Sequence, residues 1–277
     1  MAKEYAPTKL GQVHYRIGGE GTPIVLLSAA GRSSRMYDAL AALLASRFTA
    51  IAIDIPGSGS SDPLPQDASI EHLAQCVTDV LAHLKLAPAH VYGMHTGNKI
   101  AVAMAAHFPD RVRDIVLVGQ SHSIIPDRTR RNAAVQAIVS EYFDNAADWQ
   151  KWARLERAVA ALWWPEAVVA AQADRDSRLA ASALMLDALQ SSESIETLYR
   201  ANIAYDLEGD LRRLHARTLV LEVVTPHEER DLGRQGPGVV ALMHNATLAT
   251  IEEPAGHTLT LENRAHDLAR ILNDFLY

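Results

Sequence analysis

The chain has 277 residues, of which 48% are hydrophobic and 21% charged, values ordinary for one large globular domain or for a domain that carries an insertion. Its 33 acidic residues outnumber 26 basic ones, and the formal net charge of −7 argues against an extended nucleic-acid-binding surface. The single cysteine, Cys76, excludes an intramolecular disulfide and a cluster of thiolates around a structural metal.

The beginning of the chain, residues 1–7, shows no basic region followed by an apolar stretch, and no apolar run elsewhere is long enough to cross a bilayer. We therefore expect a cytoplasmic protein. The expected partner is a small-molecule substrate, with neither nucleic acid nor a membrane, and a homodimer stays open as its assembly.

Short apolar runs alternate with helical patterns along most of the chain, which is typical of strands buried on both faces of a parallel sheet. The runs are 24–27, 50–53, 90–92, 115–118, 219–221 and 246–251. Apolar residues at helical spacing predict helices over 36–44, 70–84 and 261–275. Alternation of this kind predicts a doubly wound α/β domain.

The first strand pattern, residues 10–17, is followed by the glycine-rich stretch 18–21 and then by the run at 24–27. This order predicts a hairpin between the two runs, with antiparallel strands at the edge of the sheet.

The alternation stops between about residues 122 and 209, where helical patterns follow one another without a strand. We interpret 122–209 as a helical insertion and 1–121 with 210–277 as the α/β core. All four tryptophans fall in the insertion. They either fill its own core or, as we expect for Trp163, line an apolar pocket between insertion and sheet.

Three motifs in a fixed order resemble the α/β-hydrolase superfamily, specifically its members with an inserted helical cap. Residues 54–61, Asp-Ile-Pro-Gly-Ser-Gly-Ser-Ser, match the turn after the second parallel strand. Residues 93–97, Gly-Met-His-Thr-Gly, have the glycine spacing of the nucleophile elbow. Residues 255–257, Ala-Gly-His, match the segment of the catalytic histidine. The resemblance implies a mostly parallel sheet and a site between cap and core that contains His95 and His257.

The elbow carries His95 where the family has serine, cysteine or aspartate. An elbow holds its central residue on a strained turn, and the small residues on either side allow close backbone approach. Because both glycines are present, we expect the same strained turn, with the His95 imidazole at its central position.

The triad acid also departs from the family pattern. Thr225 stands at about the expected position after the strand at 219–221, and the nearby candidates Glu222, Glu228 and Glu229 either reach His257 or are surface charges. The alternative acid position, near 119–121, holds no carboxylate. Without an acid, His257 lacks a partner that orients and stabilises its imidazolium.

A third departure replaces the family's His-Gly pair by Ser28-Ala29. The resemblance implies that the backbone amides of Ala30 and Thr96 are the oxyanion donors. Arg32 either clamps a substrate carboxylate or points into solvent. We expect the Thr96 side chain to turn toward its helix and to have a structural role.

Three interpretations of the site stay open. His95 and His257 act in hydrolysis of a small, largely apolar ester, lactone or keto compound, with His95 as nucleophile and His257 as its base, or with either imidazole as base for water. Alternatively they transfer protons in a lyase, isomerase or cofactor-free oxygenase reaction, or the protein only binds a small molecule. No cofactor and no metal are expected, although His95, His122 and His257 form an alternative zinc set.

Overall fold

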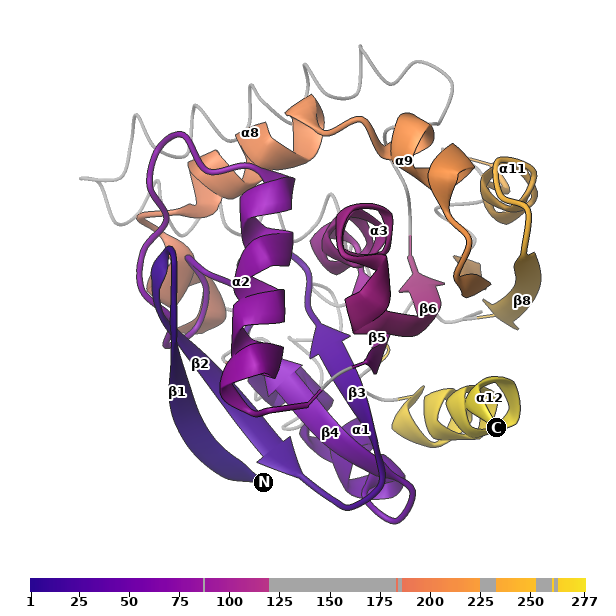
Figure 1. The fold of residues 1–277 in the computed structure, drawn as a ribbon, viewed down its shortest axis with the longest axis horizontal. Helices are drawn as coiled ribbons and strands as arrows, with labels where there is room; N and C mark the ends of the chain where they lie inside the picture. The colour runs from indigo at the N-terminus through magenta and orange to yellow at the C-terminus, as the bar shows by residue number, and fades with distance from the viewer. Residues whose placement is uncertain (87, 120–182, 184–185, 225–232, 253–260, 262–263) are drawn as a thin grey trace, which may run out of the picture.

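The computed structural model describes residues 1–86, 88–119, 183, 186–224, 233–252, 261 and 264–277. These residues form an eight-stranded sheet of order β1-β2-β4-β3-β5-β6-β7-β8 with helices on both faces (Figure 1). The strands are β1 (Ala2–Thr8), β2 (Gly11–Gly18), β3 (Thr22–Leu27), β4 (Phe48–Ile53), β5 (Ala89–Met94), β6 (Val112–Val118), β7 (Arg217–Val224) and β8 (Ala246–Glu252).

The described helices follow the strands in the alternation that the sequence predicts. They are η1 (Ser34–Tyr37), α1 (Asp38–Leu44), α2 (Ile70–His83), α3 (Thr96–His107), η2 (Pro109–Arg111), α8 (Ile195–Ala204), α9 (Leu207–Arg213), α11 (Gly236–Val240) and α12 (Ala265–Leu276). Strands β3 to β8 pair in parallel, and β1 and β2 pair antiparallel at one edge. The prediction of a doubly wound α/β fold with a mostly parallel sheet is confirmed.

The prediction of a hairpin between the first run and the run at 24–27 is wrong. Strand β2 pairs with β1 and β4, and β4 separates it from β3. The glycines between β2 and β3 serve close packing instead, because a Cβ on Gly19 would lie 2.3 Å from the carbonyl oxygen of Phe48 and one on Gly21 would lie 2.1 Å from that of Arg47. The hairpin at this edge joins β1 to β2.

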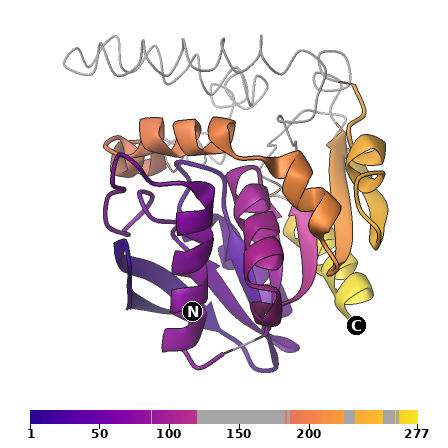
Figure 2. The same ribbon diagram turned by 45° about the horizontal axis from the view of Figure 1, so that its top comes forward.

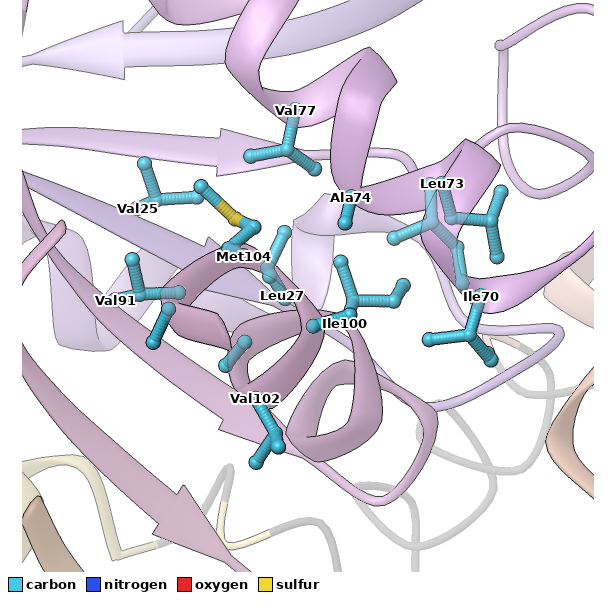
Figure 3. Packing of buried hydrophobic residues seen from close by; sticks show 14 of the residues in the cluster. Val25, Leu27, Ile70, Leu73, Ala74, Val77, Val91, Ile100, Val102 and Met104 are labelled. Atoms are coloured by element: carbon cyan, nitrogen blue, oxygen red, sulfur yellow. The ribbon is translucent and has the colours of Figure 1, made fainter. Parts of the chain in front are cut away.

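Two apolar clusters fill the space on the two sides of the sheet. In Figure 3, Val25, Leu27 and Val91 of the sheet meet residues of α2 and α3, among them Leu73 and Met104. On the other side, α1 and α12 pack against β3, β4 and β6. Helix α2 begins with a capping box in which the Ser69 hydroxyl accepts the His72 amide. The sheet is therefore covered on both faces, as a parallel sheet requires.

The described end of the predicted insertion is helical. Helix α8 lies across the end of α2 in both views (Figure 1, Figure 2), and its Leu198 and Ala201 join the same apolar cluster as α2 and α3. The bounds 122–209 stay a prediction, because residues 120–182 lie outside the described part of the chain. No helix within the described ranges has both the length and the apolar character needed to cross a membrane.

Candidate functional site

His95 occupies the turn between β5 and α3, at the carboxyl edge of the parallel strands. Its backbone angles are φ 49° and ψ −107°, a left-handed conformation that non-glycine residues rarely adopt. The turn is tight because a Cβ on Gly93 would lie 2.2 Å from the Gly97 carbonyl oxygen, and one on Gly97 would lie 2.3 Å from that of Leu27. Only glycine fits at positions 93 and 97. The Gly-x-His-x-Gly spacing in the sequence is therefore a consequence of the close backbone packing around the strained turn.

The His95 ring packs against Gly119, the residue after β6. A Cβ built on Gly119 would lie 3.0 Å from Cε1, 3.2 Å from Nδ1 and 3.3 Å from Nε2 of the imidazole. Gly119 also has a φ of 80°. The ring therefore lies at the ends of β5 and β6, where open α/β sheets bind their ligands.

Asn98, which was not predicted from the sequence, fixes the turn to β6. Its side-chain nitrogen donates to the Val118 carbonyl at 2.7 Å, and its oxygen accepts the Val118 amide at 2.9 Å. The His95 amide donates to the same carbonyl at 3.2 Å. A buried asparagine one residue after the second elbow glycine is the signal that could have found it, because a buried carboxamide needs partners.

Thr96 contacts the β3–η1 loop, defined here as residues 28–33. The Ala30 amide donates to Thr96 Oγ1 at 3.1 Å, and the Asn202 side chain of α8 donates to the same oxygen at 2.8 Å. The Thr96 side chain thus reaches the loop and α8, in contrast to the expected turn toward its own helix. The Ala30 amide, expected as an oxyanion donor, is bonded to this hydroxyl in the structure.

Arg32 does not point into solvent, one of its two expected roles, and it pairs with a carboxylate of the protein itself. It is only 4% exposed, and its Nε donates to Asp187 Oδ2 at 3.1 Å. Arg35 binds the other oxygen of the same carboxylate at 3.0 Å. A buried carboxylate needs counter-charge, and Asp187 obtains it from the residues around the loop. The ion pair joins the β3–η1 loop region to the helical segment that precedes α8.

Lys99, one turn into α3, is a buried basic residue that was not predicted from the sequence either. Its Nζ lies 2.5 Å from the carbonyl oxygen of Asn202 in the last turn of α8. A lysine at this place satisfies a carbonyl that the helix leaves without an amide partner and complements the helix dipole. Burial lowers the pKa of Lys99 to about 8.

Asp54 explains the motif at 54–61. Its carboxylate accepts the amides of Ser34 at 2.5 Å and Ser60 at 2.8 Å, and His14 Nδ1 lies 2.8 Å from it. Burial opposes ionisation of Asp54, but these hydrogen bonds outweigh it and the net pKa is lowered. A Cβ on Gly59 would lie 2.2 Å from the carboxylate, so glycine is required there. Through Asp54, the motif holds the start of η1 in place.

Glu222, one of the candidate acids, is buried in β7. Its Oε1 accepts the amides of Gln235 at 2.7 Å and Gly236 at 2.8 Å, and Arg234 lies 3.6 Å from Oε2. Glu222 and Gly119 line one small cavity. The carboxylate therefore holds the start of α11, and no described contact links it to a histidine.

The remaining sequence candidates are His257, Trp163, Thr225, Glu228, Glu229 and His122. All of them lie outside the described residues. Among the residues that are described, no group of three histidine, cysteine or carboxylate side chains could hold a metal ion.

The fold and the turn at His95 define a protein of the α/β-hydrolase class. The alpha/beta hydrolase fold family matches residues 22–218, well over half of the chain, and the chain belongs to this family.

Among curated relatives, a pimeloyl-[acyl-carrier protein] methyl ester esterase of Chromobacterium violaceum is 35% identical over 122 residues, which are 44% of this chain and 46% of that protein. The match thus spans about half the length of the relative. Among solved structures, an enol-lactonase from Burkholderia xenovorans has a TM-score of 0.72 at 22% identity and covers 99% of both chains. A hydrolase from Pseudomonas aeruginosa has a TM-score of 0.76 at 21% identity, over 99% of this chain and 98% of that one. These two structures establish likeness of fold.

Proposed function

We propose that the protein is a cofactor-independent hydrolase of a small, largely apolar ester or lactone, in which His95 acts on the substrate and His257 is its partner. The observation that carries the proposal is the left-handed turn at His95, which holds an imidazole at the carboxyl edge of the sheet. Strain of this kind persists where the surrounding structure maintains it, and it clusters at functional sites.

Imidazole suits this chemistry in two ways. It can attack the acyl carbon and form an acyl-imidazole while the acyl–oxygen bond breaks and the alcohol leaves with a proton, after which water hydrolyses the acyl-imidazole to the acid and restores the imidazole. Alternatively it can take a proton from a water that attacks the acyl carbon. Both roles use a group that ordinarily titrates near neutral pH. In each case negative charge develops on the acyl oxygen. The amide of Thr96 is the proposed donor to it, because the single N–H of Ala30 is donated to the Thr96 hydroxyl.

The names of the relatives support the acyl class of substrate. An esterase and an enol-lactonase are among the matches, and both names describe cleavage of an acyl–oxygen bond. A further relative, 25% identical over 126 residues, is named a hydrolase of an N-methylformamido-methylene succinate. We infer the ester or lactone class from the first two names together with the imidazole chemistry above.

Turnover of a panel of short acyl esters and lactones tests the proposal. The wild type is compared with His95→Ala, His257→Ala, His95→Ser and His83→Ala, the last being an exposed histidine at the end of α2. We expect the His95→Ala and His257→Ala variants to lose about 100-fold or more in kcat, as expected for loss of an acid–base or nucleophilic group, and the His83→Ala variant to equal the wild type.

Two results would contradict the proposal. In the first, the wild type turns over nothing in the panel and the His95→Ser variant gains esterase activity. This result would show that the oxyanion donor is in place and that the natural reaction of the protein belongs to another class. Turnover by the wild type that both alanine variants retain would exclude the two histidines from the reaction.

A further inference from the structure

His95, Gly119 and Glu222 occupy one row across three neighbouring parallel strands. The printed register of β5, β6 and β7 runs up to Val118, the last residue of β6, whose partner in β7 is Leu221. Hydrogen bonds continue this register by one residue. The His95 amide donates to the Val118 carbonyl at 3.2 Å, and the Gly119 amide donates to the Leu221 carbonyl at 3.4 Å. His95 therefore lies beside Gly119, and Gly119 lies beside Glu222.

The His95 ring and the Glu222 side chain lie on the same side of this row. The ring contacts the position that a Cβ of Gly119 would take. Gly119 and Glu222 line one cavity with Leu117 and Val220, which lie two residues earlier on the same strands and so face the same side of the sheet. Neighbouring strands are about 4.8 Å apart, which puts the backbones of His95 and Glu222 about 10 Å apart. The residue between them is a glycine, so no side chain at position 119 separates the imidazole from the carboxylate.

The Glu222 carboxylate is buried and held in one place. Its side chain is 9% exposed, and Oε1 accepts the amides of Gln235 and Gly236. Arg234 lies 3.6 Å from Oε2, but its side chain is 41% exposed, so solvent screens its positive charge. On the other side, Glu222 pairs in the sheet with Thr250 of β8, which carries no charge. A negative charge in such a place acts over several ångströms, because the surrounding dielectric is low.

Other charged groups near this edge of the sheet have partners of their own. These pairs are Lys99 with the Asn202 carbonyl, Arg32 with Asp187 and Asp54 with His14. They belong to α3, to the β3–η1 loop and to the residue after β4. From β7, the charge that faces the His95 row is therefore that of Glu222.

We propose that Glu222 is a positioning residue that acts through space on His95, across the gap that Gly119 leaves. A negative charge beside an imidazole stabilises its protonated form. That form arises when His95 takes a proton from water, and acylation of the ring gives it positive charge in the same way. The catalytic consequence rests on the proposed function, whereas the effect on the ring can be measured without any substrate.

NMR titration of the His95 imidazole in the whole protein tests the electrostatic step. The His95 signal is identified by its absence from the spectrum of His95→Ala. Glu222→Gln removes the charge but keeps an oxygen that can accept the amides of Gln235 and Gly236. We expect the midpoint of the His95 titration to fall by about one pH unit in Glu222→Gln, the effect of one charge several ångströms away inside a protein.

Asp110→Asn is the matched control. Asp110 is an exposed carboxylate of η2, which precedes β6, so it lies about 30 Å along the strand from Gly119. The variant removes the same charge from well beyond the Debye length of about 10 Å, and we expect a midpoint within about 0.2 pH unit of the wild type. Exchange of the Gly236 amide should stay within about threefold in Glu222→Gln, which checks that the start of α11 is kept.

Arg234→Gln gives a shift of the opposite sign. It removes the positive charge next to Glu222, so the midpoint of the His95 titration should rise by about 0.3 pH unit or more. If Glu222→Gln does not fold, this variant carries the measurement, and a midpoint that stays the same or falls would overturn the proposal.

The pH dependence of kcat/KM, for the ester that the wild type hydrolyses best, tests the catalytic step. On the acidic side of the profile, activity rises as the base of the free enzyme loses its proton. In Glu222→Gln this rise should move to lower pH by the same amount as the NMR midpoint of His95. A purely structural role of Glu222 would lower kcat/KM without moving the rise along the pH axis.

The possible outcomes separate the two proposals. A His95 midpoint within about 0.2 pH unit of the wild type in Glu222→Gln, or an equal shift in Asp110→Asn, would overturn the role of Glu222. A shifted midpoint with an unmoved pH profile would overturn its catalytic consequence. If the wild type hydrolyses nothing, the proposed function fails, and the titration alone decides whether Glu222 acts on His95.

Discussion

The imidazole of His95 lies against the backbone of Gly119, so that a Cβ at position 119 would approach Cε1 to 3.0 Å. His95 follows β5 and Gly119 follows β6, neighbouring parallel strands of the sheet. The glycine supplies both the space for the ring and the φ of 80° with which the chain leaves β6. The direction of the candidate catalytic group is therefore constrained by the residue that follows the next strand.

Substitution of Gly119 by alanine should displace the His95 ring. The positive φ alone costs about 1 kcal/mol for a residue with a Cβ, and the contact with the ring adds to it. The matched control is Gly233→Ala, because Gly233 has a φ of 69° and nothing within 4 Å of its built Cβ. We expect urea unfolding to show a larger loss for Gly119→Ala, about 2 kcal/mol against about 1 kcal/mol for the control, and ester turnover to fall only in Gly119→Ala. Equal losses in the two variants would show that the ring moves aside without cost.

Replacement of Asp187 by asparagine should destabilise the protein strongly. The change leaves the buried Arg32 without its carboxylate, and breaking a buried ion pair from one side costs about 3 kcal/mol or more. Glu208→Gln is the control, since Glu208 and Arg212 form an exposed pair 2.8 Å apart in one helix and such pairs contribute under about 0.5 kcal/mol. The free energy of unfolding of both variants checks the prediction, which fails if Asp187→Asn loses no more than the control.

Lys99 should make the stability depend on pH in the alkaline range. Burial lowers its pKa from 10.5 to about 8, so the unfolded chain binds the proton more tightly than the folded protein between these values. This contribution to stability is present above pH 10.5 and is lost as the pH falls through 8. Compared with Lys99→Met, the wild type should gain about 2 kcal/mol between pH 7 and pH 9.5. Denaturant unfolding at the two pH values measures the difference in the free energy of unfolding between the two proteins. A difference that is the same at both pH values would contradict the lowered pKa of Lys99.

Asp54 should govern part of the acid stability. Its pKa lies below the ordinary 3.8, so its contribution is present above pH 3.8 and is lost as the pH falls through the lower folded value. Asp54→Asn places an amide donor opposite the amides of Ser34 and Ser60, and we expect a loss of about 2 to 4 kcal/mol at pH 7. The difference from the wild type should shrink below pH 3.8. Asp110→Asn, at an exposed carboxylate of η2, should stay within about 0.5 kcal/mol throughout. A difference that persists undiminished at pH 2.5 would contradict this.

Six of the strands could be predicted from the sequence because each is a short apolar run. Five of them, β3 to β7, are mostly buried, as a sheet covered on both faces requires, whereas the edge strand β8 is largely exposed. The pairing at the edge could not be predicted in the same way. Strand β1 has mostly exposed residues and therefore gives no apolar signal. Without that strand, the sequence predicts that the run at 10–17 pairs with its successor. Glycines 19 and 21 suggested a hairpin turn, whereas they allow the backbone to pass close to the start of β4.

The sequence by itself determined the alternation of strands and helices from β3 onward along the described chain, the turn at His95 and the family, because each depends on local periodicity or on glycines at fixed spacing. Only the tertiary structure decided the partners of the polar groups. Arg32 bonds to Asp187, and Thr96 to Asn202, across 155 and 106 positions of the chain. Such bonds form because a charge or a hydroxyl that is buried without a hydrogen-bond partner raises the free energy of the folded state. Which partner lies within reach depends on how α8 and the segment before it pack against the core.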